Sequence, residues 1–236
     1  MNKPNFVIQI TERTRGGGLS SFNLQKIKNF LLMNGGVVIP SDSGYSFATL
    51  EINRAKHDDL INRLKSGNAT EALSFSNMRF LEQRVTLCMK TASVIEQLTP
   101  GPLILVHDKE GERKSFYNAT DIEKDEYTQF KISDSIIERE IASCSNYPIV
   151  TVELKKRDNT PIRDSNELHK VLEKVFHPSD SWALVEGADF YSKEPTVVKY
   201  NKKQQLFELI REGVISFDRI QKASDEYPLW GIEDWT

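Results

Sequence analysis

The stretch GGVVIPSDSGYSF, residues 35–47, contains the pattern that decides the fold class. Three β-branched residues run into a proline, which is typical of a buried strand, and the polar run from Ser41 to Ser46 follows at once. In open α/β sheets, ligands bind in crevices outside the ends of strands. The position therefore favours a binding site. The alternative is a turn whose Ser and Asp side chains bond their own backbone.

The composition is that of an ordinary globular protein. The chain has 236 residues, of which 39% are hydrophobic and 28% are charged, and its net charge is −3, so the overall charge does not favour a polyanionic partner. It contains no run of about 18 apolar residues and no secretory-signal pattern at its start, which predicts a cytoplasmic protein without membrane contact. Cys88 and Cys144 are not paired in a CxxC motif, and the four histidines form no metal-binding motif, so we expect no fixed metal.

Apolar periodicity predicts alternating helices and strands, which is typical of an α/β fold. Strands are expected at 5–10, 37–39, 72–76, 103–107, 129–133, 148–154, 182–187, 195–200 and 206–210. Helices are expected between Ser20 and Gly35 and at 54–65, 78–83, 90–98, 134–144 and 165–176, the last capped by Asp164. Residues 108–128 are interpreted as an exposed insertion or a ragged hairpin. No linker divides the chain, so residues 1–236 are predicted to be one domain, with a core at about 20–216 and a tail at 217–236 that contains Trp230 and Trp235.

Three segments, in this order, resemble the YrdC/YciO superfamily. Residues 35–47 match the family's first strand and its P-[ST]-[DE]-[ST]-x-Y loop, LTPGPLILV (98–106) matches its P-G-P strand, and LIREGVIS (209–216) matches its closing R-x-G. The resemblance covers roughly residues 20–216 and is closest to the YciO branch. It implies a YrdC-like single domain in which helices flank a twisted mixed β-sheet with an open concave cavity. Catalytic members of the family make threonylcarbamoyl-AMP from threonine, bicarbonate and ATP for a tRNA modification.

The resemblance also implies positions for the binding residues. The loop residues that would line the substrate cavity are Ser41, Asp42, Ser43 and Tyr45. The residues expected to bind a nucleotide or phosphate are Lys65, Lys131, Lys155, Thr196 and Arg211. An arginine can contact a phosphate through two hydrogen bonds, and a lysine acts as a point charge. Without the resemblance, Lys65 and Arg211 would equally well be solvated surface cations.

Several family positions have changed chemistry. The arginine of the K-x-R motif is Gly67 here, and a lysine found a few residues later in some relatives is Glu71. The S-x-N motif reads Glu153, Leu154 and Lys155. The remaining changes are Pro195 and Lys199 in the S-T-V-V-D segment and Lys131 in place of the arginine of the VRxP strand. We therefore expect the cavity to be retained with altered ligand chemistry, and the parent reaction to be weak or absent.

Two functions remain open from the sequence. The first is a protein that binds a nucleotide of the ATP or AMP type, or a related phosphate ligand, as a degenerate threonylcarbamoyl-AMP synthase. Threonine and bicarbonate would be its other ligands, and magnesium would arrive only with ATP. The alternative is a non-catalytic module for double-stranded RNA or tRNA, with a basic patch formed by Lys155, Lys156, Arg157 and Lys199. Solvated loop charge explains the same four residues.

Overall fold

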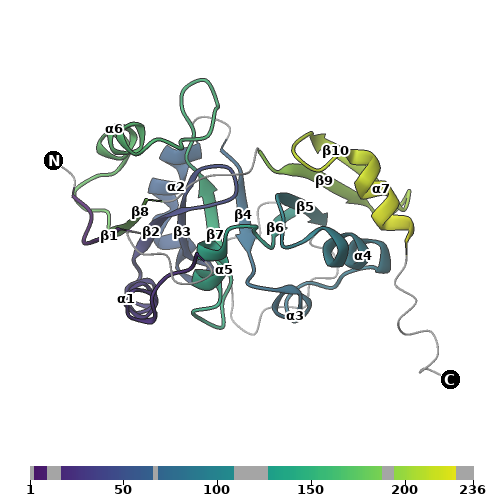
Figure 1. Ribbon diagram of the computed structural model, residues 1–236, viewed down its shortest axis with the longest axis horizontal. Coiled ribbons are helices and arrows are strands. Elements are labelled where there is room, and N and C mark those ends of the chain that lie inside the picture. Colours follow the sequence, from purple (N-terminus) through teal and green to yellow (C-terminus); the bar gives the residue numbers. More distant parts are fainter. Residues whose placement is uncertain (1–2, 10–16, 66–68, 109–126, 188–193, 227–236) are drawn as a thin grey trace.

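The computed structural model describes residues 3–9, 17–65, 69–108, 127–187 and 194–226. Within these ranges, ten strands form one mixed sheet in the order β1-β8-β2-β3-β7-β4-β6-β5-β9-β10, with helices packed against it (Figure 1). The α/β class with a mixed sheet, which the sequence predicts, is therefore confirmed. No helix in the described ranges is both long and apolar enough to cross a membrane.

The strands are β1 (Val7–Gln9), β2 (Gly36–Pro40), β3 (Tyr45–Leu50), β4 (Glu71–Ser74), β5 (Leu103–Asp108), β6 (Tyr127–Lys131), β7 (Ile149–Glu153), β8 (Trp182–Glu186), β9 (Thr196–Asn201) and β10 (Leu206–Arg211). The helices are α1 (Ser21–Leu32), the 3-10 helix η1 (Glu51–His57), α2 (Asp58–Lys65), α3 (Met78–Glu82), α4 (Met89–Leu98), α5 (Ile136–Ala142), α6 (Ser165–Val175) and α7 (Phe217–Asp225).

The expected elements occur close to their predicted positions, with three differences. Strand β3 was not predicted, and the helix expected over 54–65 is divided into η1 and α2. Part of the expected tail is the helix α7, whose Ile220 is buried in the core, so the tail prediction was wrong for this part. The Asp164 cap is confirmed, since its side chain accepts a hydrogen bond from the Glu167 backbone N–H at 3.0 Å. Most of 108–128 and both tail tryptophans lie outside the described residues.

The first five strands in the order of the sheet, β1, β8, β2, β3 and β7, are covered by helices on both faces. On one face, α1 and α5 contribute Ile27, Leu31, Ile137 and Ile141 to a core cluster; on the other, α2 and α6 contribute Leu60, Ile61, Leu168 and Leu172 to a second cluster. The apolar positions recur at intervals of one, three or four residues, which places them on one side of each helix. This part of the sheet is therefore buried on both faces.

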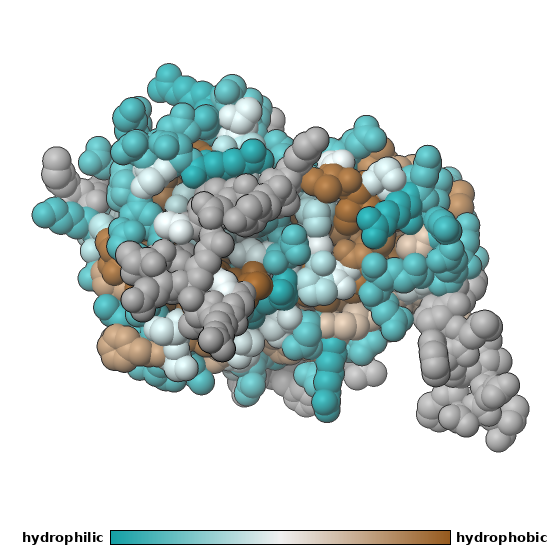
Figure 2. All heavy atoms as spheres, in the orientation of Figure 1, coloured by the Kyte–Doolittle hydropathy of each residue, from teal (hydrophilic) through white to brown (hydrophobic). Residues whose placement is uncertain are grey.

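The other five strands in the order of the sheet, β4, β6, β5, β9 and β10, pack against a different set of helices. On one of their faces, α3, α4 and α7 contribute Leu81, Val94, Ile95 and Ile220 to a third cluster. On the opposite face, the described residues form the small cluster of Ala72, Ile104 and Val197. Strand β10 forms an edge of the sheet, and Figure 2 shows hydrophobic residues on the surface at this end of the molecule. The sheet thus has one face, between β7 and β9, on which polar side chains replace a packed helix.

The turn between β2 and β3 is positioned by strand pairing. The two strands pair antiparallel from Val37 with Ala48 to Pro40 with Tyr45, and the Ser41 N–H donates to the Gly44 carbonyl at 2.8 Å. A Cβ atom at Gly44 would lie 2.5 Å from the Ile162 carbonyl oxygen, so this position requires glycine. The turn is therefore held inside the molecule, between the ends of β6 and β7.

Candidate functional site

The polar turn that follows β2 is buried. Ser41, Asp42, Ser43 and Tyr45 are each less than 9% exposed. A buried polar group is costly unless it has a hydrogen-bond partner. One Asp42 oxygen, Oδ1, accepts hydrogen bonds from the Ser133 hydroxyl and from the Asp134 backbone N–H, both at 2.7 Å. The turn is thus bonded to other elements and does not simply satisfy itself.

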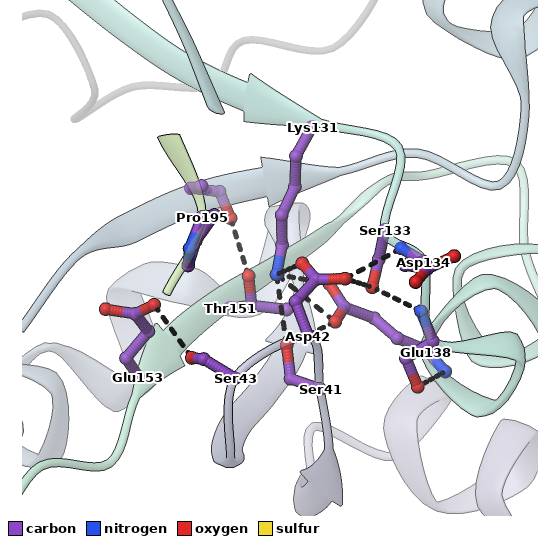
Figure 3. A network of polar contacts seen from close by, with 12 residues as sticks. Ser41, Asp42, Ser43, Lys131, Ser133, Asp134, Glu138, Thr151, Glu153 and Pro195 are labelled. Atoms are coloured by element: carbon purple, nitrogen blue, oxygen red, sulfur yellow. Dashed lines mark hydrogen bonds and ion pairs between the residues drawn. The ribbon is translucent and has the colours of Figure 1, made fainter. Parts of the chain in front are cut away.

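Lys131 at the end of β6 is the centre of this network (Figure 3). Its Nζ atom lies 3.1 Å from Asp42 Oδ2, 2.9 Å from Glu138 Oε1 and 3.1 Å from the Ser41 hydroxyl. Burial alone lowers the pKa of Lys131, but the Asp42 and Glu138 carboxylates outweigh it and hold the pKa above its ordinary value. The ammonium group is therefore charged, and its three protons are directed at protein acceptors.

The sequence analysis missed Glu138, which is fully buried on α5. Its Oε2 atom accepts a hydrogen bond of 2.5 Å from the Ser41 hydroxyl, so the carboxylate joins the turn to the helix. The available signal was its place between Ile137 and Ile141, which puts it at the border of the apolar side of the helix. A charged residue at that border would ordinarily be assigned to solvent.

A second charged group surrounds Glu153 at the end of β7. Its Oε1 atom accepts a long hydrogen bond of 3.4 Å from the Ser43 hydroxyl. Its Oε2 atom lies 3.3 Å from Lys155 Nζ and 3.8 Å from Arg211 Nη1. A second carboxylate, Glu194, lies 4.0 Å from Lys155 and 3.5 Å from Arg211. Two cations thus share two carboxylates beside the turn. We call Glu153, Lys155, Glu194 and Arg211 the four-charge cluster.

Two residues at the start of β4 and just before it, Glu71 and Thr70, contact Lys65 and Arg211. The Arg211 Nη1 group donates to the Thr70 hydroxyl at 3.3 Å, and the Glu153 backbone N–H donates to the Thr70 carbonyl at 3.2 Å. Lys65 forms an ion pair with the next residue, Glu71. Burial acts to raise the pKa of Glu71, but hydrogen bonds from Arg54 and Lys65 hold that pKa below its ordinary value. Thr70 therefore links Arg211 to Glu153 beside the turn, whereas the contact of Lys65 is with Glu71.

The remaining predicted residues have other contacts. The Thr196 hydroxyl donates to the Ile215 carbonyl at 2.7 Å and accepts from the Ile215 N–H at 3.1 Å, so it closes the loop that follows β10. Arg211 supports the same loop, since its Nε and Nη2 atoms donate to the Pro195 carbonyl at 3.3 and 3.2 Å. The Tyr45 hydroxyl accepts from the Gly187 N–H at 3.4 Å. Their roles toward a ligand stay predictions.

The four residues of the predicted RNA patch do not form one exposed basic surface. Lys155 is buried against Glu153, and Lys156 forms an ion pair of 2.7 Å with Glu167. Arg157 is exposed on the loop, whereas Lys199 is half-buried on β9. Metal binding has no candidate group either: the described residues contain no cluster of three or more His, Cys, Asp or Glu side chains that could hold an ion.

Four buried side-chain oxygens lack a hydrogen-bond partner among the described residues: Ser74 Oγ, Gln129 Oε1, Glu138 Oε1 and Glu153 Oε2. The two carboxylate oxygens do have ion-pair contacts with lysines, at 2.9 Å for Glu138 and 3.3 Å for Glu153. Strand pairing puts the side chains of Ser74, Gln129 and Glu153 on the sheet face that also carries Lys131. A buried polar atom without a partner requires an explanation, and a ligand or a bound water that donates a hydrogen bond is one. This face, with the turn and the four-charge cluster beside it, is the candidate ligand site.

Comparison with known proteins gives the fold. No protein-family model and no curated protein matches the sequence. Among solved structures, E. coli YciO has a TM-score of 0.72 and 14% sequence identity, over 92% of this chain and 100% of that chain. A double variant of P. abyssi Sua5 has a TM-score of 0.71 and 16% identity, over 92% of this chain and 62% of that chain. The P. abyssi Sua5 complex with L-threonine also gives 0.71 and 16%, over 92% and 60%.

The chain therefore has the YrdC-like fold that the sequence predicts. It spans about 62% of the length of the Sua5 chain that it matches. A more distant match is full-length HypF in a phosphate- and nucleotide-bound form, with a TM-score of 0.60 and 15% identity, over 80% of this chain and 28% of that chain. At these identities the similarity extends to the fold alone, and the open concave cavity stays a prediction.

Proposed function

We propose that this chain binds an AMP-type nucleotide, or a related ligand with a single phosphate, at the candidate ligand site. Lys65 and Arg211 would contact the phosphate, and the turn from Ser41 to Tyr45 would contact the small substrate. The observation that carries the proposal is the four-charge cluster beside the turn, in which Arg211 Nη1 lies 3.8 Å from Glu153 Oε2 and the Ser43 hydroxyl donates to Glu153 Oε1.

The charges at the site favour a single phosphate over a triphosphate. Each predicted phosphate-binding cation already has a carboxylate partner: Lys65 pairs with Glu71, and Lys131 with Asp42 and Glu138. Lys155 and Arg211 share Glu153 and Glu194. Two unit charges about 4 Å apart interact by roughly 4 kcal/mol at an intermediate effective dielectric constant, so each extra phosphate charge near these carboxylates opposes binding. ATP-dependent synthesis of threonylcarbamoyl-AMP is therefore expected to be weak or absent.

The ligands of proteins with the same fold support this proposal. One Sua5 structure is a complex with L-threonine, and one HypF structure contains phosphate and a nucleotide. We accordingly include threonine and bicarbonate as co-ligands, magnesium only as a companion of ATP, a connection with tRNA modification, and a cytoplasmic location. RNA or tRNA binding stays the alternative, although the four predicted patch residues do not form one exposed basic surface.

Isothermal titration calorimetry with AMP tests the proposal. We expect binding by the unaltered protein, at least tenfold weaker binding by Lys65→Ala, and unchanged binding by the matched control Lys222→Ala, whose side chain is exposed on α7. No heat and no thermal shift with millimolar AMP, ADP or ATP would overturn the proposed function. Pyrophosphate release from ATP, threonine and bicarbonate at a robust rate would show that the parent reaction has been retained.

A further inference from the structure

Glu153 occupies the position that an anionic ligand would need in order to reach Lys155 and Arg211. Its carboxylate lies between the two cations, at 3.3 and 3.8 Å, and its side chain is only 9% exposed. The Lys155 side chain is equally inaccessible, at 6%. A ligand phosphate that approached these cations would therefore have to compete with a carboxylate that is already in place.

The acceptors on this sheet face lead to the same conclusion. The Oε2 atom of Glu153, apart from its ion-pair contacts, and the Oε1 atom of Gln129 on β6 are buried without a hydrogen-bond partner, and both can only accept. A fully ionised phosphate group also brings only acceptors, so it satisfies neither atom. Water or a ligand group with N–H or O–H donors satisfies both. The face around Glu153 therefore complements the donor-bearing part of a ligand and not its phosphates.

We infer that Glu153 determines specificity, as an internal counter-ion that excludes polyphosphate from the four-charge cluster. The site then accepts a single phosphate near Lys65 and the outer side of Arg211, and it rejects a second or third phosphate further in. This inference rests on the proposed function, because it concerns the same site. Glu153 does not react with the ligand in this account; it sets the charge that the site tolerates.

The test is binding of inorganic pyrophosphate, which measures the polyphosphate preference without a nucleotide. We expect Glu153→Gln to bind pyrophosphate at least tenfold more tightly than the unaltered protein does. The amide has nearly the same shape, can still accept from Ser43, and removes the negative charge between Lys155 and Arg211. The matched control is Glu167→Gln, which removes the same charge from an ion pair with Lys156, outside the cluster, and should leave pyrophosphate affinity unchanged.

Equal pyrophosphate affinity of Glu153→Gln and the unaltered protein, with the variant folded by circular dichroism, would overturn the inference. An equal gain in Glu167→Gln would also overturn it, because the effect would then be one of net charge alone. AMP is titrated in parallel. Absence of AMP binding by the unaltered protein, together with a gain of pyrophosphate binding in Glu153→Gln, would refute the proposed function and leave the counter-ion role of Glu153 supported.

A second variant covers the case in which Glu153→Gln does not fold. Glu194→Gln also removes one carboxylate from Lys155 and Arg211, but its side chain is 34% exposed and so tolerates the change. We expect about a threefold gain in pyrophosphate affinity, smaller than that of Glu153→Gln because solvent screens Glu194. No gain over the Glu167→Gln control would contradict the inference.

Discussion

The Asp42 carboxylate and the Lys131 ammonium form an ion pair of 3.1 Å that joins the turn after β2 to the end of β6, and both side chains are almost completely buried. Glu138 contacts the same ammonium from α5, so one lysine connects β6 and α5 to a turn about 90 residues earlier in the sequence. The turn that lines the candidate ligand site is therefore held in place by charge as well as by backbone hydrogen bonds.

Removing Lys131 should be severely destabilising. The variant Lys131→Met leaves two buried carboxylates without a cation, and breaking a buried pair in this way costs about 3–5 kcal/mol. Urea denaturation of Lys131→Met, Asp42→Asn and the double variant checks this. We expect the double variant to lose less stability than the two single variants together, because it removes both members of one pair. A loss below about 1 kcal/mol in Lys131→Met would contradict the assigned role.

Arg211 should bind the ligand through the shape of its guanidinium group as well as its charge. Lysine at this position retains the charge, but it cannot hold the Pro195 carbonyl and the Thr70 hydroxyl at the same time as a phosphate. We expect Arg211→Lys to weaken AMP binding by about tenfold, as measured by calorimetry. The control is Arg84→Lys. Arg84 is not one of the predicted site residues, and its side chain donates a hydrogen bond to the Asn146 carbonyl, which the lysine would lose. Unchanged AMP affinity in Arg211→Lys would place the phosphate elsewhere.

His57 should make the protein less stable in mild acid. Burial lowers the pKa of His57 below its ordinary value of 6.5, despite a hydrogen bond between its ring and the Asn34 carbonyl. As the pH falls, the unfolded chain takes up this proton before the folded chain does. The stabilisation is therefore complete above about pH 6.5 and is lost as the pH falls toward the folded-state pKa.

Thermal unfolding at pH 7.5 and at pH 5.5 measures this difference. The drop in melting temperature between the two conditions should be smaller in His57→Gln than in the unaltered protein, whereas His177→Gln, an exposed control, should retain the full drop. Identical drops in all three proteins would exclude His57 as the cause.

Binding of RNA should be weak and without structural specificity. Of the predicted patch, Lys155 is buried and Lys156 is paired with Glu167, so few phosphates can be neutralised at once. We expect no binding of double-stranded RNA or tRNA tighter than about 10 µM at physiological salt, by filter retention over a salt series. Tighter binding that falls steeply with salt and is lost in Lys156→Ala/Arg157→Ala would restore the RNA-binding alternative.

The sequence predicted the helix and strand alternation because each buried element has a strong local pattern, as in Val37 to Ile39 of β2. It missed β3, whose first residues, Tyr45 and Ser46, look like part of a turn. These residues are buried because β3 lies between β2 and β7 in the sheet and Tyr45 packs in a core cluster. Local pattern also missed α7, which has few apolar positions but is held by packing on α4.

The candidate site was predicted in its location but not in its charge balance. The turn, Lys65 and Arg211 were identified by motif; the structure joins Arg211 to Glu153 beside the turn and pairs Lys65 with Glu71. Glu138 and Glu194 were not identified, because their partners lie in other elements of the chain. Charge pairing between distant elements has no period or motif, so it can be read only from the folded chain.

The Glu153 and Glu194 carboxylates balance the charges of Lys155 and Arg211 within the protein itself. Because these cations are already neutralised, the unliganded chain needs no bound anion in order to fold or to remain folded. A ligand phosphate near Arg211 then meets a cation that already has two carboxylate partners, so it gains less than it would beside an unpaired cation. Occupancy of such a site can rise and fall with ligand concentration while the structure of the protein stays the same.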